Sequence, residues 1–231
     1  MSEVFRQEKK FLITLDQYYR YCAKLTQLLH SDKHGTKDGY LIRSLYFDSI
    51  DDRDFEEKEE GVELRRKIRI RIYGPDSQFA KLEIKRKEGP LQKKNSLKIT
   101  REEAEELIKG NYSILLKREE EVATECYYMM NQYCYRPKTI VSYNRKAFVA
   151  KENNIRITFD HHIKASESNF DLFSKNLNEN YVMNPYLVVL EVKYNNFLLS
   201  YIKDMLEECD ASDLSVSKYC MGRGISKHYN F

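Results

Sequence analysis

The chain has 231 residues, enough for one large domain or two small ones with a substantial core. Its 39 Lys and Arg residues nearly balance its 36 Asp and Glu residues, so the net charge of +3 excludes binding to nucleic acid through total charge alone. The five cysteines include no CxxC pair, which predicts reduced thiols and no zinc site.

Residues 1–20 lack the apolar segment of a signal peptide. No apolar run reaches the length of about 18 residues that a membrane-spanning helix needs. We therefore expect a cytoplasmic protein without a membrane segment of its own.

The first half of the chain alternates between strand and helix patterns. Residues 5–13 are typical of a strand, and we expect Asp16 to cap a helix that runs to Leu29. Glycine and proline in Gly74-Pro75-Asp76-Ser77 predict a turn that joins two strands into a hairpin. The other predicted segments are strands at 40–48, 65–73 and 79–86, a helix or loop at 54–60, and a strand or loop at 92–97.

The second half returns to strands after two helical segments. Thr100 and Glu103 form a capping box that predicts a helix over 101–109, and residues 111–132 are expected to be one amphipathic helix. We then expect strands at 139–150, 155–160 and 186–194, a polar irregular stretch at 160–184, a helix at 195–208 and a terminal segment at 215–224. Because no linker or repeat is visible, we expect a single domain over residues 1–231.

Residues 65–73 are the most informative stretch. Ile68, Ile70 and Ile72 alternate with cations, which predicts a strand with one apolar and one basic face. The charged residues that share a strand face in this and other predicted strands are Arg6, Glu8 and Lys10; Lys67, Arg69 and Arg71; Lys81, Glu83 and Lys85; Arg145; Arg156; and Glu191 with Lys193.

Two architectures explain such faces. An antiparallel sheet with its polar face in water accounts for any single strand. Six strands rich in Arg and Lys favour a barrel with charged residues inside and apolar residues outside, covered by amphipathic helices. We therefore predict an α+β fold built on a closed antiparallel β-barrel.

A cavity lined by cations needs an anionic guest, because like charges repel and buried unpaired charges are costly. Phosphate matches guanidinium geometry, and the few carboxylates would hold Mg²⁺ or Mn²⁺ that bridges to phosphate oxygens. This combination favours phosphoryl transfer or hydrolysis on a tri- or polyphosphate. No Ser/His/Asp or Cys/His arrangement suggests a side-chain nucleophile.

Eight short motifs occur in order along the chain. They are R-x-E-x-K (6–10), S-L-Y-F-D (44–48), R-K-I-R-I-R-I-Y-G (66–74), L-E-I-K (82–85), Y-N-R-K-A-F (143–148), R-I-T-F-D (156–160), L-E-V-K-Y (190–194) and S-K-Y (217–219). Together they resemble the VTC domain, the catalytic domain of the vacuolar transporter chaperone, which is a polyphosphate polymerase. The family belongs to the triphosphate tunnel metalloenzymes (CYTH-like superfamily), and the resemblance implies a closed tunnel of about eight antiparallel strands.

The resemblance implies roles for matching positions. The residues expected to bind and neutralise the triphosphate of ATP and the growing chain are Lys10, Arg69, Arg71, Lys85, Arg145, Arg156 and Lys218. Further substrate contacts are expected from Arg6, Lys67, Lys81, Tyr143, Lys193 and Lys93, with Lys94 as the alternative to Lys93. Glu191 is the expected ligand of Mn²⁺ or Mg²⁺, and Glu8 and Glu83 complete the candidate metal set.

The expected function is transfer of the ATP γ-phosphate to a polyphosphate chain. The expected partners are ATP and polyphosphate, without nucleic acid, and a membrane or another protein stays open as a partner. Arg6 stands where hydrolytic tunnel enzymes have the first Glu of E-x-E-x-K, which weakens the case for a triphosphatase or a class IV-type adenylyl cyclase. The alternatives are a tripolyphosphatase or nucleoside triphosphatase, and a non-catalytic binding module.

Overall fold

The computed structural model describes residues 6–36, 38–89, 91–209 and 217–227, with the side chain of Arg6 left out. The strands are β1 (Arg6–Thr14), β2 (His30–Ser31), β3 (Tyr40–Asp48), β4 (Leu64–Ile72), β5 (Phe79–Glu88), β6 (Leu91–Thr100), β7 (Arg136–Val149), β8 (Arg156–Ser166), β9 (Asn180–Tyr181) and β10 (Leu187–Asn195). The helices are α1 (Leu15–Leu28), α2 (Arg53–Glu59), α3 (Arg101–Ile108), α4 (Glu121–Gln132), α5 (Ser200–Glu207) and α6 (Lys218–Lys227), with 3₁₀ turns η1 (Tyr112–Lys117) and η2 (Glu152–Asn154). No helix in the described ranges is long and apolar enough to cross a membrane.

Hydrogen bonds join the strands into one large antiparallel sheet. Its order is β1-β10-β8-β7-β3-β4-β5-β6, with β2 beside β7 and β9 beside β8. This confirms the predicted α+β fold with about eight principal strands. The order starts at β1 and ends at β6, so in the described part of the chain hydrogen bonds do not close the sheet between those two strands.

The chain forms two compact units. Unit 1 is drawn from residues 1–41, 143–163 and 183–216, and unit 2 from residues 42–142, 164–182 and 217–231. The long strands β3, β7 and β8 contribute residues to both. The expectation of a single domain over residues 1–231 stays a prediction.

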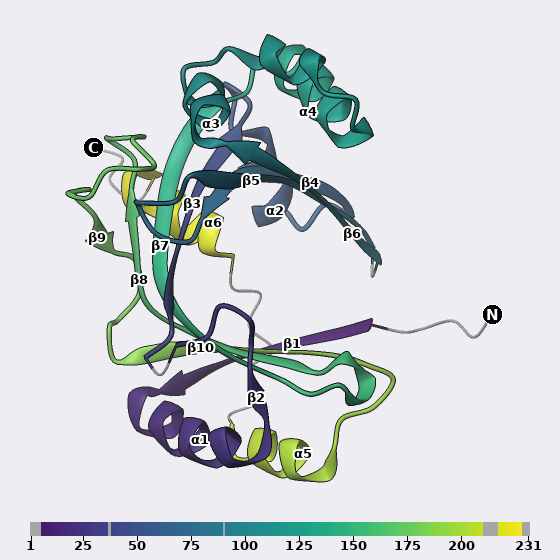
Figure 1. Ribbon diagram of the computed structural model, residues 1–231, viewed down its shortest axis with the longest axis vertical. Helices are drawn as coiled ribbons and strands as arrows, with labels where there is room; N and C mark the ends of the chain where they lie inside the picture. The colour runs from purple at the N-terminus through teal and green to yellow at the C-terminus, as the bar shows by residue number, and fades with distance from the viewer. Residues whose placement is uncertain (1–5, 37, 90, 210–216, 228–231) are drawn as a thin grey trace. The chain divides into compact units, whose positions relative to one another are not determined.

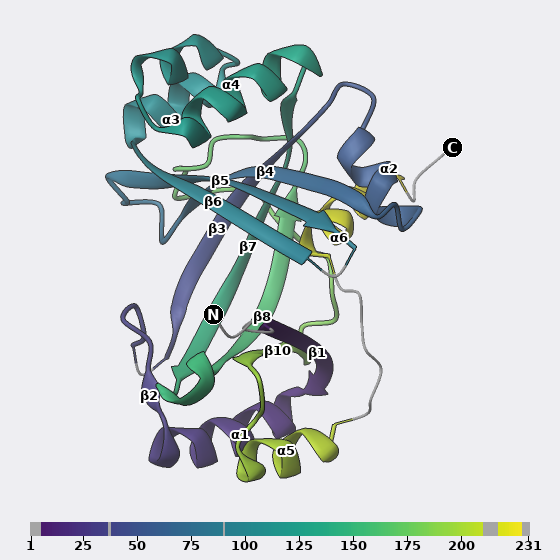
Figure 2. The same ribbon diagram turned by 90° about the vertical axis from the view of Figure 1, so that its right-hand side faces the viewer.

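In unit 2 the alternation of the central strand is confirmed. Ile68, Ile70 and Ile72 are fully buried and belong to one core with residues of β5, β6, α3, η1 and α4. Figures 1 and 2 both show α3 and α4 on one side of β5 and β6. Since side chains alternate along a strand, the cations that alternate with these apolar residues lie on the side away from these helices; they are Lys67, Arg69, Arg71, Lys81 and Lys85.

Unit 1 repeats this plan with other elements. Phe11 and Ile13 of β1 pack with apolar residues of β8 and β10 against α1 and α5. Figure 2 shows α1 and α5 lying alongside each other next to β1 and β10. Glu8, Lys10, Arg156, Glu191 and Lys193 therefore share the opposite face of this part of the sheet.

The cap of α1 differs from the prediction. The Thr14 hydroxyl accepts the Gln17 N–H at 3.2 Å, and the Gln17 side chain accepts the Thr14 N–H at 2.9 Å. This capping box starts the helix at Leu15, so Asp16 lies in the first turn and is not the cap. The capping box predicted for Thr100 and Glu103 is confirmed at the start of α3.

Residues 111–132 do not form one helix. The turn η1 ends at Lys117, Arg118 has extended backbone angles, and α4 begins only at Glu121. The Arg118 guanidinium donates to both carboxylate oxygens of Glu103, at 2.9 and 2.6 Å. This ion pair with α3 stabilises the extended backbone at Arg118, where the amphipathic pattern predicted a continuous helix.

Other observed boundaries of helices and strands also differ from the predicted ones. β8 continues to Ser166 and β9 lies at 180–181, so the stretch 160–184 is less irregular than expected. α5 begins at Ser200 rather than at Asn195, which belongs to β10. Of the predicted first and terminal segments, residues 5, 215 and 216 lie outside the described residues.

Two buried aspartates organise the start of α2 in unit 2. The Asp48 carboxylate accepts the N–H groups of Asp54 at 2.8 Å and Phe55 at 2.9 Å, and it also accepts the Tyr219 hydroxyl of α6. Asp54 is itself 1% exposed, and its Oδ1 accepts the Tyr135 hydroxyl at 2.8 Å. Burial, together with the nearby charge of Asp48, raises the pKa of Asp54 to about 8.

Replacing Asp54 with Asn is expected to flatten the pH dependence of stability. The folded chain keeps the Asp54 proton up to about pH 8, whereas an ordinary aspartate loses it near pH 3.8. Raising the pH through this window therefore favours unfolding of the wild type, and the stabilising contribution is fully present only below the lower value. The Asp54→Asn variant keeps an acceptor for Tyr135 and does not titrate. Thermal unfolding between pH 5 and 8 should show the variant gaining on the wild type, and parallel curves would contradict the assignment.

Candidate functional site

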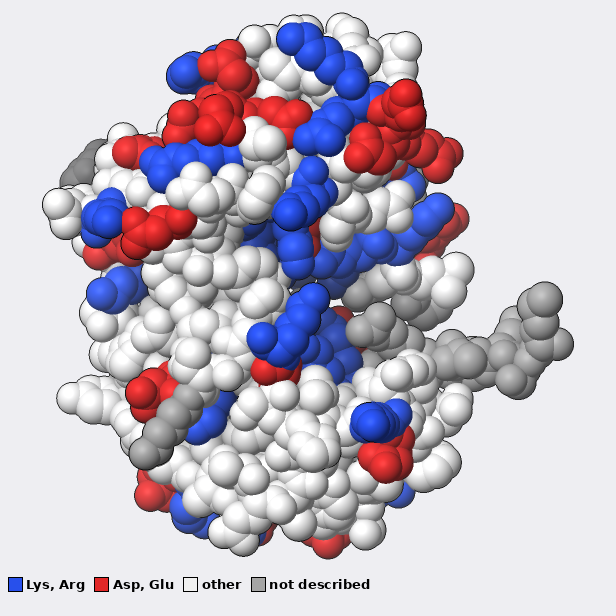
Figure 3. All heavy atoms as spheres, viewed as in Figure 1, with Lys and Arg blue, Asp and Glu red and all other residues white. Residues whose placement is uncertain are grey.

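The register of β4, β5 and β6 brings cations together in rows across unit 2. Side chains opposite one another on neighbouring strands share a face of the sheet. The rows are Arg71, Lys81 and Lys98; Arg69, Glu83 and Ser96; and Lys67, Lys85 and Lys94. Figure 3 shows Lys and Arg side chains gathered in the part of the view that β4 to β6 occupy in Figure 1.

The same register separates two neighbouring lysines of β6. Lys94 pairs with Lys85 and lies on the basic face, whereas Lys93 pairs with Arg86 on the opposite face. The structure therefore places Lys94, and not Lys93, with the other predicted phosphate-binding residues of unit 2.

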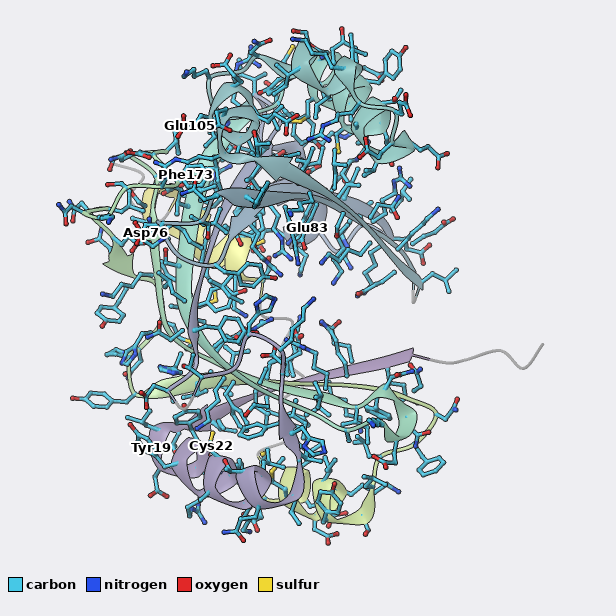
Figure 4. The ribbon with its side chains drawn as sticks, viewed as in Figure 1. Tyr19, Cys22, Asp76, Glu83, Glu105 and Phe173 are labelled. Atoms are coloured by element: carbon cyan, nitrogen blue, oxygen red, sulfur yellow. The ribbon has the colours of Figure 1, made fainter. Side chains whose placement is uncertain are left out.

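Glu83 is the one carboxylate in these three rows. Its Oε2 lies 2.7 Å from Arg69 Nε and 3.7 Å from Arg71 Nη2, and its Oε1 contacts the Lys94 ammonium. Figure 4 shows Glu83 on the side of β5 away from α3 and α4. Burial raises the pKa of Glu83, but the three cations outweigh burial and lower it to about 2. Glu83 is therefore ionised at every physiological pH.

Tyr46 fixes Arg69 from a second direction. Arg69 Nη1 donates to the Tyr46 hydroxyl at 2.9 Å, and the ring of Tyr46 lies 5.2 Å from that of Tyr219. Burial raises the pKa of Tyr46, but Arg69, Arg71 and Lys67 lower it below its ordinary value. The S-L-Y-F-D motif contained this residue, yet only the pairing of Tyr46 with Arg69 across β3 and β4 shows its role.

Unit 1 carries a second charged face, on β1, β10 and β8. In the register, Lys10 lies opposite Glu191 and Glu8 lies opposite Lys193. Lys10 Nζ is 3.0 Å from Glu8 and 3.9 Å from Glu191, while Lys193 Nζ is 2.6 Å from Glu191 and 3.5 Å from Glu8. Two carboxylates and two ammonium groups thus form a closed ring of ion pairs.

Arg145 is held by a carboxylate that sequence reasoning missed. Its Nε and Nη2 donate to the two oxygens of Asp160 at 2.6 and 2.7 Å, and Asp160 is completely buried. Burial lowers the pKa of Arg145, but the Asp160 charge outweighs burial and raises it. The guanidinium also lies 5.4 Å from the ring of Tyr143. This geometry is the bidentate pairing that fixes an arginine most firmly.

Arg156 has a corresponding partner in Asp32. Arg156 Nη2 donates to Asp32 Oδ2 at 2.6 Å, and the Tyr40 hydroxyl donates to the same oxygen at 2.7 Å. Burial raises the pKa of Asp32, but the hydrogen bonds from Tyr40 and Arg156 lower it below its usual range. Asp32 lies between the predicted helix that ends at Leu29 and the predicted strand that begins at residue 40, and nothing in the local sequence indicates its contact with Arg156.

The carboxylates differ in how well they fit a divalent metal. In the described ranges no group of three or more His, Cys, Asp or Glu residues gathers where a metal could be held. Mg²⁺ and Mn²⁺ are commonly bound by one or two carboxylates together with phosphate oxygens and water, and the pair of Glu8 and Glu191 fits that donor set. Glu83 fits less well, because both of its oxygens already face cations.

Residues 5–227 match the VTC domain family. The chain belongs to this family. The match confirms the resemblance seen in the sequence and includes residues of both units of the VTC domain.

Two solved structures share the fold of this VTC domain. A putative adenylate cyclase from Bacillus halodurans gives a TM-score of 0.54 at 12% identity, over 92% of this chain and 95% of the other. A putative adenylyl cyclase from Hippeastrum, described as having a dominant triphosphatase activity, gives 0.56 at 12% identity, over 95% and 96%. At this identity the likeness concerns the fold alone. No match is found among curated proteins.

The predicted site residues of the VTC domain fall into two groups. On the basic face of unit 2 lie Lys67, Arg69, Arg71, Lys81, Glu83 and Lys85, and Lys218 is the first residue of α6. On the charged face of unit 1, or beside it, lie Glu8, Lys10, Tyr143, Arg145, Arg156, Glu191 and Lys193. Arg6 pairs with Asn195 at the start of β1, and its side chain is outside the described part of the structure. The roles of these residues stay predictions.

Lys94→Ala and Lys93→Ala form a matched test of the basic face. The two variants lose the same charge from neighbouring positions, but only Lys94 lies in the cation rows. Lys94→Ala should weaken binding of inorganic tripolyphosphate about tenfold, which corresponds to about 1.4 kcal/mol. Lys93→Ala should leave the affinity nearly unchanged, because an exposed charge on the other face is screened. Isothermal titration calorimetry measures both, and equal losses would contradict this placement of the site.

Proposed function

We propose that this VTC domain is a metal-dependent polyphosphate polymerase that transfers the γ-phosphate of ATP to a growing polyphosphate chain. The observation that supports this most is that the family match coincides with strand faces rich in Arg and Lys. Such faces suit a substrate that is a linear series of negative charges. ATP and polyphosphate are accordingly the proposed partners, and nucleic acid is not among them.

In the proposed reaction, a terminal phosphate oxygen of the chain attacks the γ-phosphorus of ATP. The bond from that phosphorus to the β,γ-bridging oxygen breaks, and ADP leaves with the electron pair. Little covalent chemistry is needed from the protein, since catalysis of phosphoryl transfer consists mostly of positioning and charge neutralisation. Arg69, Arg71, Lys85 and Lys94 would bind phosphate oxygens in unit 2, and Lys10, Arg145 and Arg156 would do so in unit 1.

A divalent metal belongs to the proposal. Mn²⁺ or Mg²⁺, held by Glu191 with Glu8, would supply additional positive charge to the phosphate oxygens. In the structure, Lys10 and Lys193 form ion pairs with the same two carboxylates. These lysines would turn toward phosphate when the carboxylates bind the metal.

The second candidate function is hydrolysis of tripolyphosphate or nucleoside triphosphates. The described activity of the Hippeastrum protein, which shares the fold, favours it. Water would replace the chain terminus as the attacking group, while the same cations would neutralise the charge. A fold can host several reactions, so product analysis must separate the two candidates.

Purified protein incubated with ATP and Mn²⁺ should form long-chain polyphosphate and an equal amount of ADP. Gel electrophoresis and phosphorus NMR resolve the products. Glu191→Gln or removal of the metal with a chelator should abolish the reaction, whereas Glu207→Gln, which removes an exposed carboxylate of α5, should not.

Other products would change the assignment. Orthophosphate without chains would move it to hydrolysis. Binding of ATP or polyphosphate without any turnover would indicate a binding module.

A further inference from the structure

We propose that Glu83, Asp160 and Asp32 are positioning residues that fix the arginines of the two charged faces before substrate binds. Each of these carboxylates is buried, and each directly contacts one of Arg69, Arg145 and Arg156. This role rests on the proposed function, because these arginines are the ones proposed to bind phosphate. It differs from the metal-binding role first expected for Glu83.

The contacts of Arg69 show how one side chain is fixed in unit 2. Glu83 occupies its Nε at 2.7 Å, and Tyr46 occupies its Nη1 at 2.9 Å. Glu83 and Tyr46 stand on the two strands that flank β4, so the guanidinium is held from both sides. Rotation about the end of the side chain would break both hydrogen bonds.

Arg145 and Arg156 are fixed in a similar way in unit 1. Asp160 takes Nε and Nη2 of Arg145 together, which sets the plane of the guanidinium. Asp32 takes Nη2 of Arg156 and is oriented by the Tyr40 hydroxyl and by the His34 N–H at 3.1 Å. Each arginine thus has a carboxylate, and each carboxylate comes from a different part of the chain.

Stability alone does not account for these carboxylates. A buried ion pair adds little net stability compared with an apolar pair of similar size, because desolvation offsets the attraction. A free arginine loses much rotamer freedom when it binds phosphate, and an arginine fixed beforehand has already lost it. Groups that are fixed before the reaction also stabilise the charge that develops in the transition state of phosphoryl transfer.

Positioning and simple charge balance make opposite predictions for Glu83→Gln. If Glu83 only reduced the positive charge, its loss would strengthen anion binding and leave turnover unchanged or faster. If Glu83 positions Arg69, its loss lowers kcat even though the face becomes more positive. The Glu88→Gln variant removes an exposed carboxylate from the end of the same strand and serves as the matched control.

We expect Glu83→Gln to lower kcat about tenfold, with little change in the Kd for tripolyphosphate, because the added positive charge offsets the lost ordering of Arg69. Tyr46→Phe changes no charge and should lower kcat about threefold, which tests the proposal should Glu83→Gln fold poorly. Glu88→Gln should behave as wild type. The Mn²⁺ concentration for half-maximal activity should not change in any variant.

Two results would overturn the role of Glu83. Wild-type kcat combined with tighter binding would reduce Glu83 to charge balance. A raised requirement for Mn²⁺ in Glu83→Gln would make it a metal ligand instead.

A spectroscopic readout separates this inference from the proposed function. If the wild type converts no ATP, the proposed function fails, but the Nε–Hε NMR signal of Arg69 still reports its mobility. That signal should be rigid and protected from solvent exchange in the wild type and mobile in Glu83→Gln. Equal rigidity in the two proteins would overturn the positioning role.

Discussion

The pairing of β4 with β5 determines which side chains share a face, and the basic surface of unit 2 depends on it. Ile68 and Ile70 lie opposite Ile84 and Leu82, so the apolar residues meet the helices together. The same pairing aligns Arg69 with Glu83 and Arg71 with Lys81. A slip of one residue would place isoleucines in water and cations in the core, so the cost of exposing this core keeps the cations in register.

Repulsion within such a surface has to be offset locally, because the net charge of the whole chain is only +3. The chain does this with one or two carboxylates placed among the cations. In unit 2 one carboxylate meets three cations, and in unit 1 two carboxylates alternate with two lysines. In both arrangements the ion pairs give the charged side chains defined positions.

Patterns that repeat over a few residues were predictable from the sequence. The alternation in β4 gave its two faces, and Thr100 with Glu103 gave the start of α3. The VTC motifs located the cations on strands. The cap of α1 was misjudged because Thr14 competes with Asp16 for the same helix start, and only the Gln17 contact decides between them.

Contacts between distant residues were not predictable from the sequence. Asp32 and Arg156 are 124 residues apart, and neither position signals the other. The choice between Lys93 and Lys94 depended on the register with β5, which a short lysine-rich strand does not fix by itself. The break before α4 depends on an ion pair between Arg118 and Glu103, which an amphipathic pattern cannot reveal.

The hydrogen bond from the Tyr219 hydroxyl to the Asp48 carboxylate has a consequence for genetic screens. Tyr219 packs on Tyr46, which in turn holds Arg69, so α6 and the start of α2 are joined to the basic face through two aromatic rings. Loss-of-function alleles should therefore accumulate at Asp48 and Tyr219, although neither is proposed to bind phosphate. A map of such alleles would outline the support of the site as well as the site itself.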